Sequence, residues 1–149
     1  MFERLAQPGR DVLVDARAVA RELGSPTVEA EHLLLAAARR SDGPLAESGL
    51  DYDSLLEALA TERAVSLAAV GVMLDPGPAS PPVGQPRWAT SAKVAIQRAM
   101  HAAVGRGDKQ IDARHVAIGV LRAQLGTVPR ALECAGVDRI GLLTWLEAN

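Results

Sequence analysis

The sequence predicts an all-α protein in which two pseudo-symmetric four-helix repeats form one compact helical bundle. The apolar residues are mostly Ala, Leu and Val and only 3% of the residues are aromatic, a composition that suits closely packed helices. Apolar positions also recur at helical spacing along most of the chain. The stretch EAEHLLLAAAR at 29–39 returns in altered form as DARHVAIGVLR at 112–122, which indicates an internal duplication.

The duplication joins two halves through a segment of different composition. His32 and His115 lie 83 positions apart, and Gly24 falls on Gly107 at the same offset. The segment GVMLDPGPASPPVGQPR at 71–87 contains five prolines and three glycines, which prevent regular structure. We therefore expect a single domain with a linker at 71–87. The domain spans 1–149, repeat one 1–70 and repeat two 88–149.

The first helix of repeat one has a clear apolar pattern and a clear C-terminal boundary. Apolar residues from Val12 to Leu23 recur at helical spacing and stop at Gly24, which Pro26 follows, as at many helix C-termini. The remaining helices of this repeat are expected at 33–38, at 44–48 and from 51 to about 70.

Repeat two shows the same order of elements. Asp112 is a good N-cap for its second helix, whereas Glu29 at the matching place in repeat one is a weaker one. Helices this short are marginal alone, so their stability must come from packing of their apolar stripes. The four helices are expected at about 90–105, 112–124, 127–135 and 137–148.

Composition and charge also bear on location and ligands. No apolar run approaches the roughly 18 residues that a membrane span needs. The net charge is −2, and the helix at 112–124 offers only Arg114 and Arg122 for a DNA-reading surface. The start MFERLAQPGRD carries charges where a signal peptide has its apolar run, and Cys134 is the only cysteine. We expect a cytoplasmic protein that binds neither membrane nor nucleic acid.

Several segments together resemble a known family. The start MFERLAQPGRDVLVDA, the EHLLLA that follows a Gly-containing turn, and a second copy after a Pro/Gly linker are similar to the double repeat at the N-terminus of Clp unfoldases. The resemblance covers nearly the whole chain and points to the ClpC branch through MFER and EHLLL. Clp ATPases continue into AAA+ modules, whereas this chain has no G-x-x-x-x-G-K-[ST] phosphate loop. The resemblance therefore implies a stand-alone recognition domain without ATPase activity.

The resemblance implies a first set of ligand-binding residues. In actinobacterial ClpC a face formed by the two first helices binds cyclic peptide antibiotics, and its residues correspond to Phe2, Arg10, Trp88 and Lys93. An aromatic pair flanked by two cations is also the composition of a peptide-binding hot spot. The alternative is that Phe2 and Trp88 only fill the seam between the repeats, because large aromatic side chains gain stability from burial.

A second implied site concerns phosphorylated arginine. The ClpC branch recognises it through the glutamate that precedes each histidine, and Glu31 occupies that place in repeat one. In repeat two the residue is Arg114, whose charge repels a guanidinium, and the threonine that usually precedes the glutamate is Ala30 or Ala113. At most one such site is expected. The alternative is that Glu31 is only an acidic first-turn residue favoured by the helix dipole.

The remaining polar residues raise an enzymatic alternative. A small hydrolase or metal enzyme would use His32, His115 or Cys134, but the sequence lacks a paired nucleophile and base and a cluster of metal ligands. We expect both histidines to pack and hydrogen-bond at helix N-termini, and Cys134 to be a buried, inert thiol. His101 is expected on a helix surface and Trp145 in the core.

The leading functional hypothesis is a non-enzymatic protein- and peptide-binding module that modulates a Clp protease system and needs no cofactor or metal. It would act as an adaptor that brings substrates to the unfoldase, or as a decoy that holds ligands. Its partners would be Clp adaptors, substrates or the ClpC unfoldase, together with cyclic peptides or arginine-phosphorylated proteins.

Overall fold

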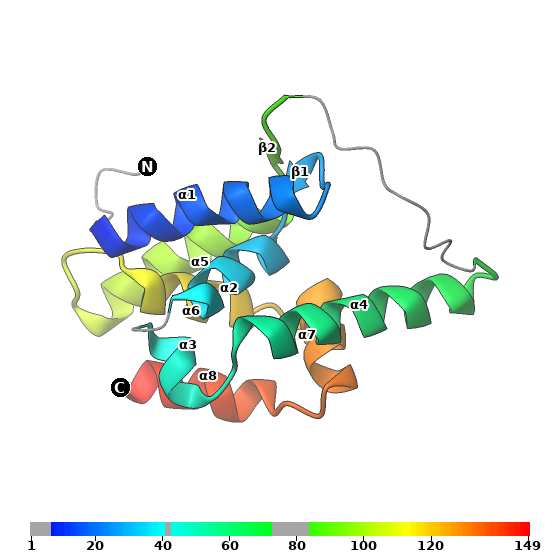
Figure 1. Ribbon diagram of the computed structural model, residues 1–149. Helices are drawn as coiled ribbons and strands as arrows, with labels where there is room; N and C mark the ends of the chain where they lie inside the picture. The colour runs from blue at the N-terminus through cyan, green and yellow to red at the C-terminus, as the bar shows by residue number, and fades with distance from the viewer. Residues whose placement is uncertain (1–6, 41–42, 73–83) are drawn as a thin grey trace.

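The computed structural model describes residues 7–40, 43–72 and 84–149, and it contains eight helices and two short strands in these ranges (Figure 1). In chain order the elements are α1 (Gln7–Glu22), β1 (Thr27–Val28), α2 (Ala30–Arg39), α3 (Pro44–Ser48), α4 (Tyr52–Ala69), β2 (Arg87–Trp88), α5 (Thr90–Arg106), α6 (Ala113–Leu121), α7 (Thr127–Cys134) and α8 (Arg139–Ala148).

The predicted all-α class and its two sets of four helices are confirmed. Each predicted helix is present, and its ends differ from the prediction by a few residues. The strands β1 and β2 were not predicted: they pair in parallel, with Thr27 opposite Arg87 and Val28 opposite Trp88. Arg87, the last residue of the predicted linker, is therefore in a strand, while residues 73–83 of that linker lie outside the described residues.

The first helix of each repeat ends in the same way. α1 is followed by Gly24 with φ 73°, and α5 by Gly107 with φ 73°. These left-handed positions suit glycine, which lacks a Cβ atom. Beyond them the backbone N–H of Ser25 donates to the carbonyl of Ala20, and the chain turns away from the helix axis. The sequence therefore stops both helices at equivalent places.

The centre of the molecule is the pair α2 and α6 (Figure 1). Both helices have long runs of consecutive buried residues, 32–38 in α2 and 115–121 in α6. α1 packs on α2, α5 packs on α6, and α2 and α6 pack on each other. A helix that is apolar on all sides is stable only when others surround it, so the outer helices of both repeats cover one continuous core.

α4 packs on α7, and an ion pair between the buried Glu62 and the exposed Arg130 joins the two helices. Glu62 is only 5% exposed, and its carboxylate accepts hydrogen bonds from Arg130 Nε at 2.9 Å and from Ser66 Oγ at 2.5 Å. Burial raises the pKa of Glu62, but these two hydrogen bonds outweigh it and lower the pKa overall. The C-terminal part of α4 extends past the other helices (Figure 1).

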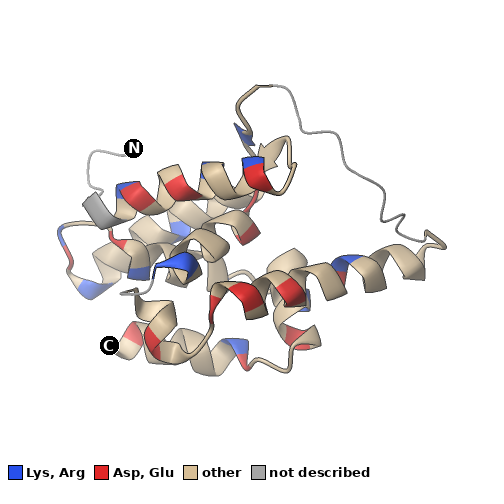
Figure 2. Cartoon of the chain, in the orientation of Figure 1, with Lys and Arg blue, Asp and Glu red and all other residues tan. Residues whose placement is uncertain are grey.

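Charged residues of both signs are interspersed on the outer helices, as along α1 (Figure 2). Within the described ranges, no helix combines the length and the apolar character that crossing a bilayer requires.

Gly119 lets α6 approach α5 closely. A Cβ atom at this position would collide with the carbonyl oxygen of Ala95 and lie 2.8 Å from the backbone nitrogen of Ala99. We predict that Gly119→Ala lowers the free energy of unfolding by about 1–3 kcal/mol, because backbone atoms of α5 must move. Chemical denaturation measures this change.

The matched control for this substitution is Gly105→Ala, also in a helix. A Cβ atom there meets no other atom within 4 Å, so alanine should leave stability unchanged or raise it by less than about 1 kcal/mol. Equal stabilities of Gly119→Ala and wild type would show that α5 and α6 are not in close contact.

Candidate functional site

The two histidines of the repeats are buried at the N-termini of α2 and α6. His32 is 5% exposed and His115 is 3% exposed. The Nδ1 atom of His32 accepts the backbone N–H of Glu29 at 2.8 Å, and that of His115 accepts the backbone N–H of Asp112 at 3.0 Å. Each histidine therefore satisfies a backbone donor at the start of a buried helix. The expected structural role of both is confirmed.

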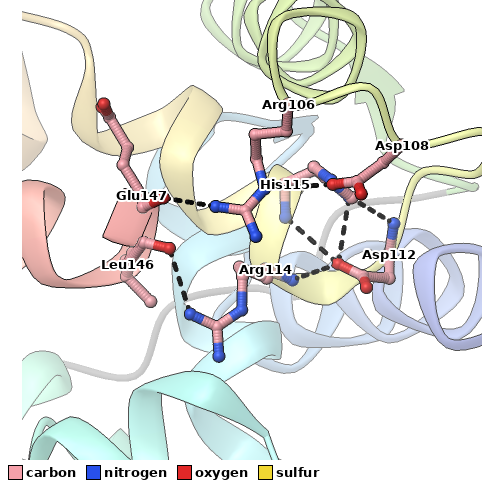
Figure 3. Close-up of polar contacts among 7 residues, drawn as sticks. All are labelled: Arg106, Asp108, Asp112, Arg114, His115, Leu146 and Glu147. Carbon is pink, nitrogen blue, oxygen red and sulfur yellow. Dashed lines mark hydrogen bonds and ion pairs between the residues drawn. The ribbon is translucent and has the colours of Figure 1, made fainter. Parts of the chain in front are cut away.

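In repeat two the histidine is part of a larger polar cluster (Figure 3). His115 Nε2 lies 2.7 Å from Asp108 Oδ2, and the same oxygen accepts Arg106 Nε at 3.0 Å. Arg106 in turn donates to the backbone carbonyl of Glu147 near the end of α8. Since Nδ1 accepts a backbone N–H, the neutral ring carries its proton on Nε2 and donates it to Asp108.

The two histidines have opposite electrostatic surroundings. The side-chain carboxylate of Asp112, whose Oδ1 lies 3.1 Å from Nδ1, raises the pKa of His115 against the effect of burial, and the carboxylate of Asp108 adds to the rise. For His32 burial dominates and lowers the pKa, and the nearby charge of Glu29 offsets it only in part. The duplicated element therefore holds one histidine in a site that favours the charged form and one in a site that favours the neutral form.

Arg114 of repeat two has an internal structural role. It stands at the position equivalent to Glu31, and its Nη1 donates to the carbonyl of Leu146 at 3.0 Å (Figure 3). Its guanidinium also lies 5.7 Å from the centre of the Trp145 ring, a cation–π distance. Trp145, expected in the core, packs against the core while remaining partly exposed. Arg114 thus attaches α8 to α6.

Glu31 instead lines a pocket of about 390 Å³. The pocket lies between the N-terminus of α2, the first half of α5 and the loop from α6 to α7. Next to it, Ser91 Oγ donates to the carboxylate of Glu29 at 2.8 Å and accepts the backbone N–H of Ala30 at 2.9 Å. These two bonds connect the repeats and fix the backbone beside Glu31.

The carboxylate of Glu31 is half-buried and has no cationic partner among the described residues. Burial raises its pKa; a hydrogen bond from its own backbone N–H opposes this, and the charges of Glu29 and Glu62 add to the rise. A carboxylate in such surroundings binds a cation favourably, because the cation replaces lost hydration and offsets the neighbouring negative charges.

The rest of the pocket was not foreseen from the sequence. Arg98 lines it from α5, Val94 and Val128 provide apolar surface, and Leu125 at its rim is 89% exposed. One signal could have identified Arg98: at the repeat offset of 83 it falls on Asp15. This is a reversal of charge like that of Glu31 and Arg114, so the two repeats differ in charge at two related positions.

Three of the four residues implied for the peptide-binding face lie within the described residues. Trp88 is partly buried against the core, and the guanidinium of Arg17 lies 5.3 Å from the centre of its ring. Arg17 was missed in the sequence, and its Nε atom is buried without a hydrogen-bond partner among the described residues. Arg10 and Lys93 are exposed on α1 and α5, and Phe2 lies outside the described residues.

The prediction for Cys134 was wrong. The thiol is exposed. α7 buries Val128, Ala131 and Leu132, and at about 100° per residue Cys134, the last residue of the helix, falls outside the arc that these three residues cover. Its apolar sequence neighbours misled the prediction. His101 is exposed as expected. In the part of the chain that the structure describes, no group of three or more His, Cys, Asp or Glu side chains is arranged to hold a metal ion.

No protein-family model and no curated protein matches the sequence. Among solved structures, the N-terminal domain of the caseinolytic protease associated chaperone ClpD from Arabidopsis thaliana matches with a TM-score of 0.75 at 20% identity, over 99% of this chain and 95% of that chain. The Hsp104 N-terminal domain from Candida albicans matches with a TM-score of 0.62 at 15% identity, over 97% and 89%.

A structure from a malarial protein secretion system matches with a TM-score of 0.66 at 15% identity, over 97% of this chain and 93% of that chain. The chain therefore has the fold of Clp chaperone N-terminal domains, as the sequence resemblance implied.

We predict that His115 titrates above the ordinary pKa of about 6.5 and His32 below it. The stabilising contribution of His115 is then complete below pH 6.5 and is lost as the pH rises through its folded pKa. The neutral His32 acts in the opposite sense, since stability falls as the pH drops from 6.5 through its folded pKa. Nuclear magnetic resonance of the imidazole signals measures both values.

Unfolding experiments give an independent check. His115→Gln should lose less stability than wild type between pH 6.5 and 8, and His32→Gln should lose less between pH 6.5 and 5. A shift of both histidines in the same direction would contradict the difference between the two sites.

Proposed function

We propose that this chain is a non-enzymatic module that binds peptide segments of substrates or adaptors in a Clp protease system. The observation that carries the proposal is the pocket beside α2, where the half-buried Glu31 has no cationic partner among the described residues. The Clp N-terminal-domain fold over nearly the whole chain supports the same class of function. Arginine-phosphorylated segments are one ligand class for this pocket, with the guanidinium bound to Glu31.

The second binding surface in this proposal is the face that carries Phe2, Arg10, Trp88 and Lys93, with cyclic peptides that target ClpC among its ligands. A specific observation favours it: Arg17 stacks on Trp88 and keeps its Nε atom without a hydrogen-bond partner in the described residues. The guanidinium places a cation beside the Trp88 ring, while its buried Nε atom is out of reach of a ligand at the surface. A partly exposed aromatic ring with cations nearby is a common feature of peptide-binding hot spots.

Two modes of action fit such a module. An adaptor would bring substrates to the unfoldase, and a decoy would hold ligands that otherwise occupy it. A degradation assay with a ClpC-type unfoldase and its protease separates the two, because an added adaptor accelerates substrate loss and an added decoy slows it.

Binding at the Glu31 pocket is tested by calorimetry with an arginine-phosphorylated peptide. We predict that Glu31→Gln weakens binding about tenfold or more, because a charge-assisted hydrogen bond is lost. The control is Glu57→Gln, which removes an exposed carboxylate of α4 and should bind like wild type. Equal affinities for Glu31→Gln and wild type would remove this pocket from the proposal.

Binding at the Trp88 face is tested by fluorescence titration with a cyclic peptide in a Trp145→Phe background, so that Trp88 alone reports. We predict that Arg17→Gln and Lys93→Ala each weaken binding several-fold by removing cations from the face. Lys109→Ala, an exposed lysine on another surface, is the control. Loss of binding in the control to the same extent would indicate only a general effect of charge.

A further inference from the structure

The pocket that Glu31 lines also contains a positively charged side chain. Arg98 lines the same pocket from α5, and no hydrogen bond or ion pair of its side chain occurs within the described residues. No ion pair joins Arg98 to Glu31 although both side chains line this pocket, so the guanidinium nitrogens and the carboxylate oxygens are more than 4.0 Å apart.

Two oppositely charged side chains that are unpaired within the described residues restrict the chemistry of a ligand for this pocket. A ligand that satisfies both groups needs a cation for Glu31 and an anion for Arg98, separated by a stretch of apolar atoms that can pack against Val94 and Val128. In phosphorylated arginine the phosphate is bonded directly to the guanidinium, so its two charges are adjacent. In a C-terminal arginine or lysine, the whole aliphatic side chain separates the charged head from the terminal carboxylate.

We propose that this pocket binds the C-terminal residue of a partner chain that ends in arginine or lysine. Glu31 binds the side-chain cation, Arg98 binds the terminal carboxylate, and the aliphatic part of the side chain packs on the apolar wall. Leu125, 89% exposed at the rim, covers the residue that precedes it. The inference rests on the proposed peptide-binding function and assigns a ligand class to its pocket.

Charge complementarity favours a chain end over an internal basic residue. An internal arginine or lysine would neutralise Glu31 and leave Arg98 without an anion. A bidentate pair between a guanidinium and a carboxylate is among the stronger polar contacts in proteins. Because burial raises the pKa of Glu31, its carboxylate is protonated at a higher pH than an exposed one, and the affinity for a cation should fall on acidification.

Calorimetry with three eight-residue peptides tests the proposal. The first ends in arginine with a free carboxylate, the second in the same arginine as an amide, and the third in citrulline with a free carboxylate. For wild type we expect the first peptide to bind about tenfold more tightly than either of the others, because each of these lacks one charged contact.

Variants of the two charged residues separate the contacts. In Arg98→Gln the acid and the amide should bind equally, and in Glu31→Gln arginine and citrulline should bind equally. Arg63→Gln, an exposed arginine of α4, is the matched control and should retain all differences. Thermal unfolding confirms that each variant is folded before titration.

The outcomes distinguish this inference from the function on which it rests. Equal binding of acid and amide by wild type overturns the C-terminal assignment while leaving peptide binding intact. Tighter binding of an internal arginine-phosphorylated peptide, unaffected by Arg98→Gln, also overturns it and assigns the pocket to phosphorylated arginine. Failure of every peptide to bind overturns both the inference and the proposed function at this pocket.

Discussion

The burial of α2 and α6 against each other is the constraint on which the rest of the structure depends. Their residues at 32–38 and 115–121 have almost no contact with water, so the backbone donors at their first turns need partners inside the protein. His32 and His115 provide those partners by accepting a backbone N–H. This requirement explains why both copies carry a histidine at the same place although much of their sequence differs.

The residue before each histidine is under no such constraint, and the two copies use it differently. Arg114 donates to a carbonyl of α8 and stacks near Trp145, so its charge holds the last helix in place. Glu31 points into a pocket that α5 and the α6–α7 loop complete. The two repeats therefore share a scaffold but differ in the side chain at the start of the central helix. Of these two positions, only Glu31 in repeat one is a carboxylate, and it is unpaired within the described residues.

The fold was predictable because its helices follow from local pattern, whereas the pocket depends on distant segments. Apolar periodicity, helix-end signals and the internal repeat together predicted the eight helices, but β1 and β2 have two residues each, too few for an alternating pattern to appear. Cys134 was misplaced because the prediction used its neighbours rather than its angle around α7. The family resemblance supplied Glu31 but not Arg98, whose approach to the pocket depends on the packing of α5 on α6.

A comparison of Glu31 with Glu62 indicates which carboxylate is available for a ligand. Glu62 is almost fully buried, yet hydrogen bonds from Ser66 and Arg130 lower its pKa, so its charge is already stabilised within the fold. Glu31 is more exposed, but burial and nearby negative charges raise its pKa. Its charge is therefore costly to keep, and a bound cation removes that cost. The same relief adds to the affinity for a cationic ligand, which is why an unpaired, half-buried carboxylate in a pocket is a stronger indication of binding than a fully buried one with partners.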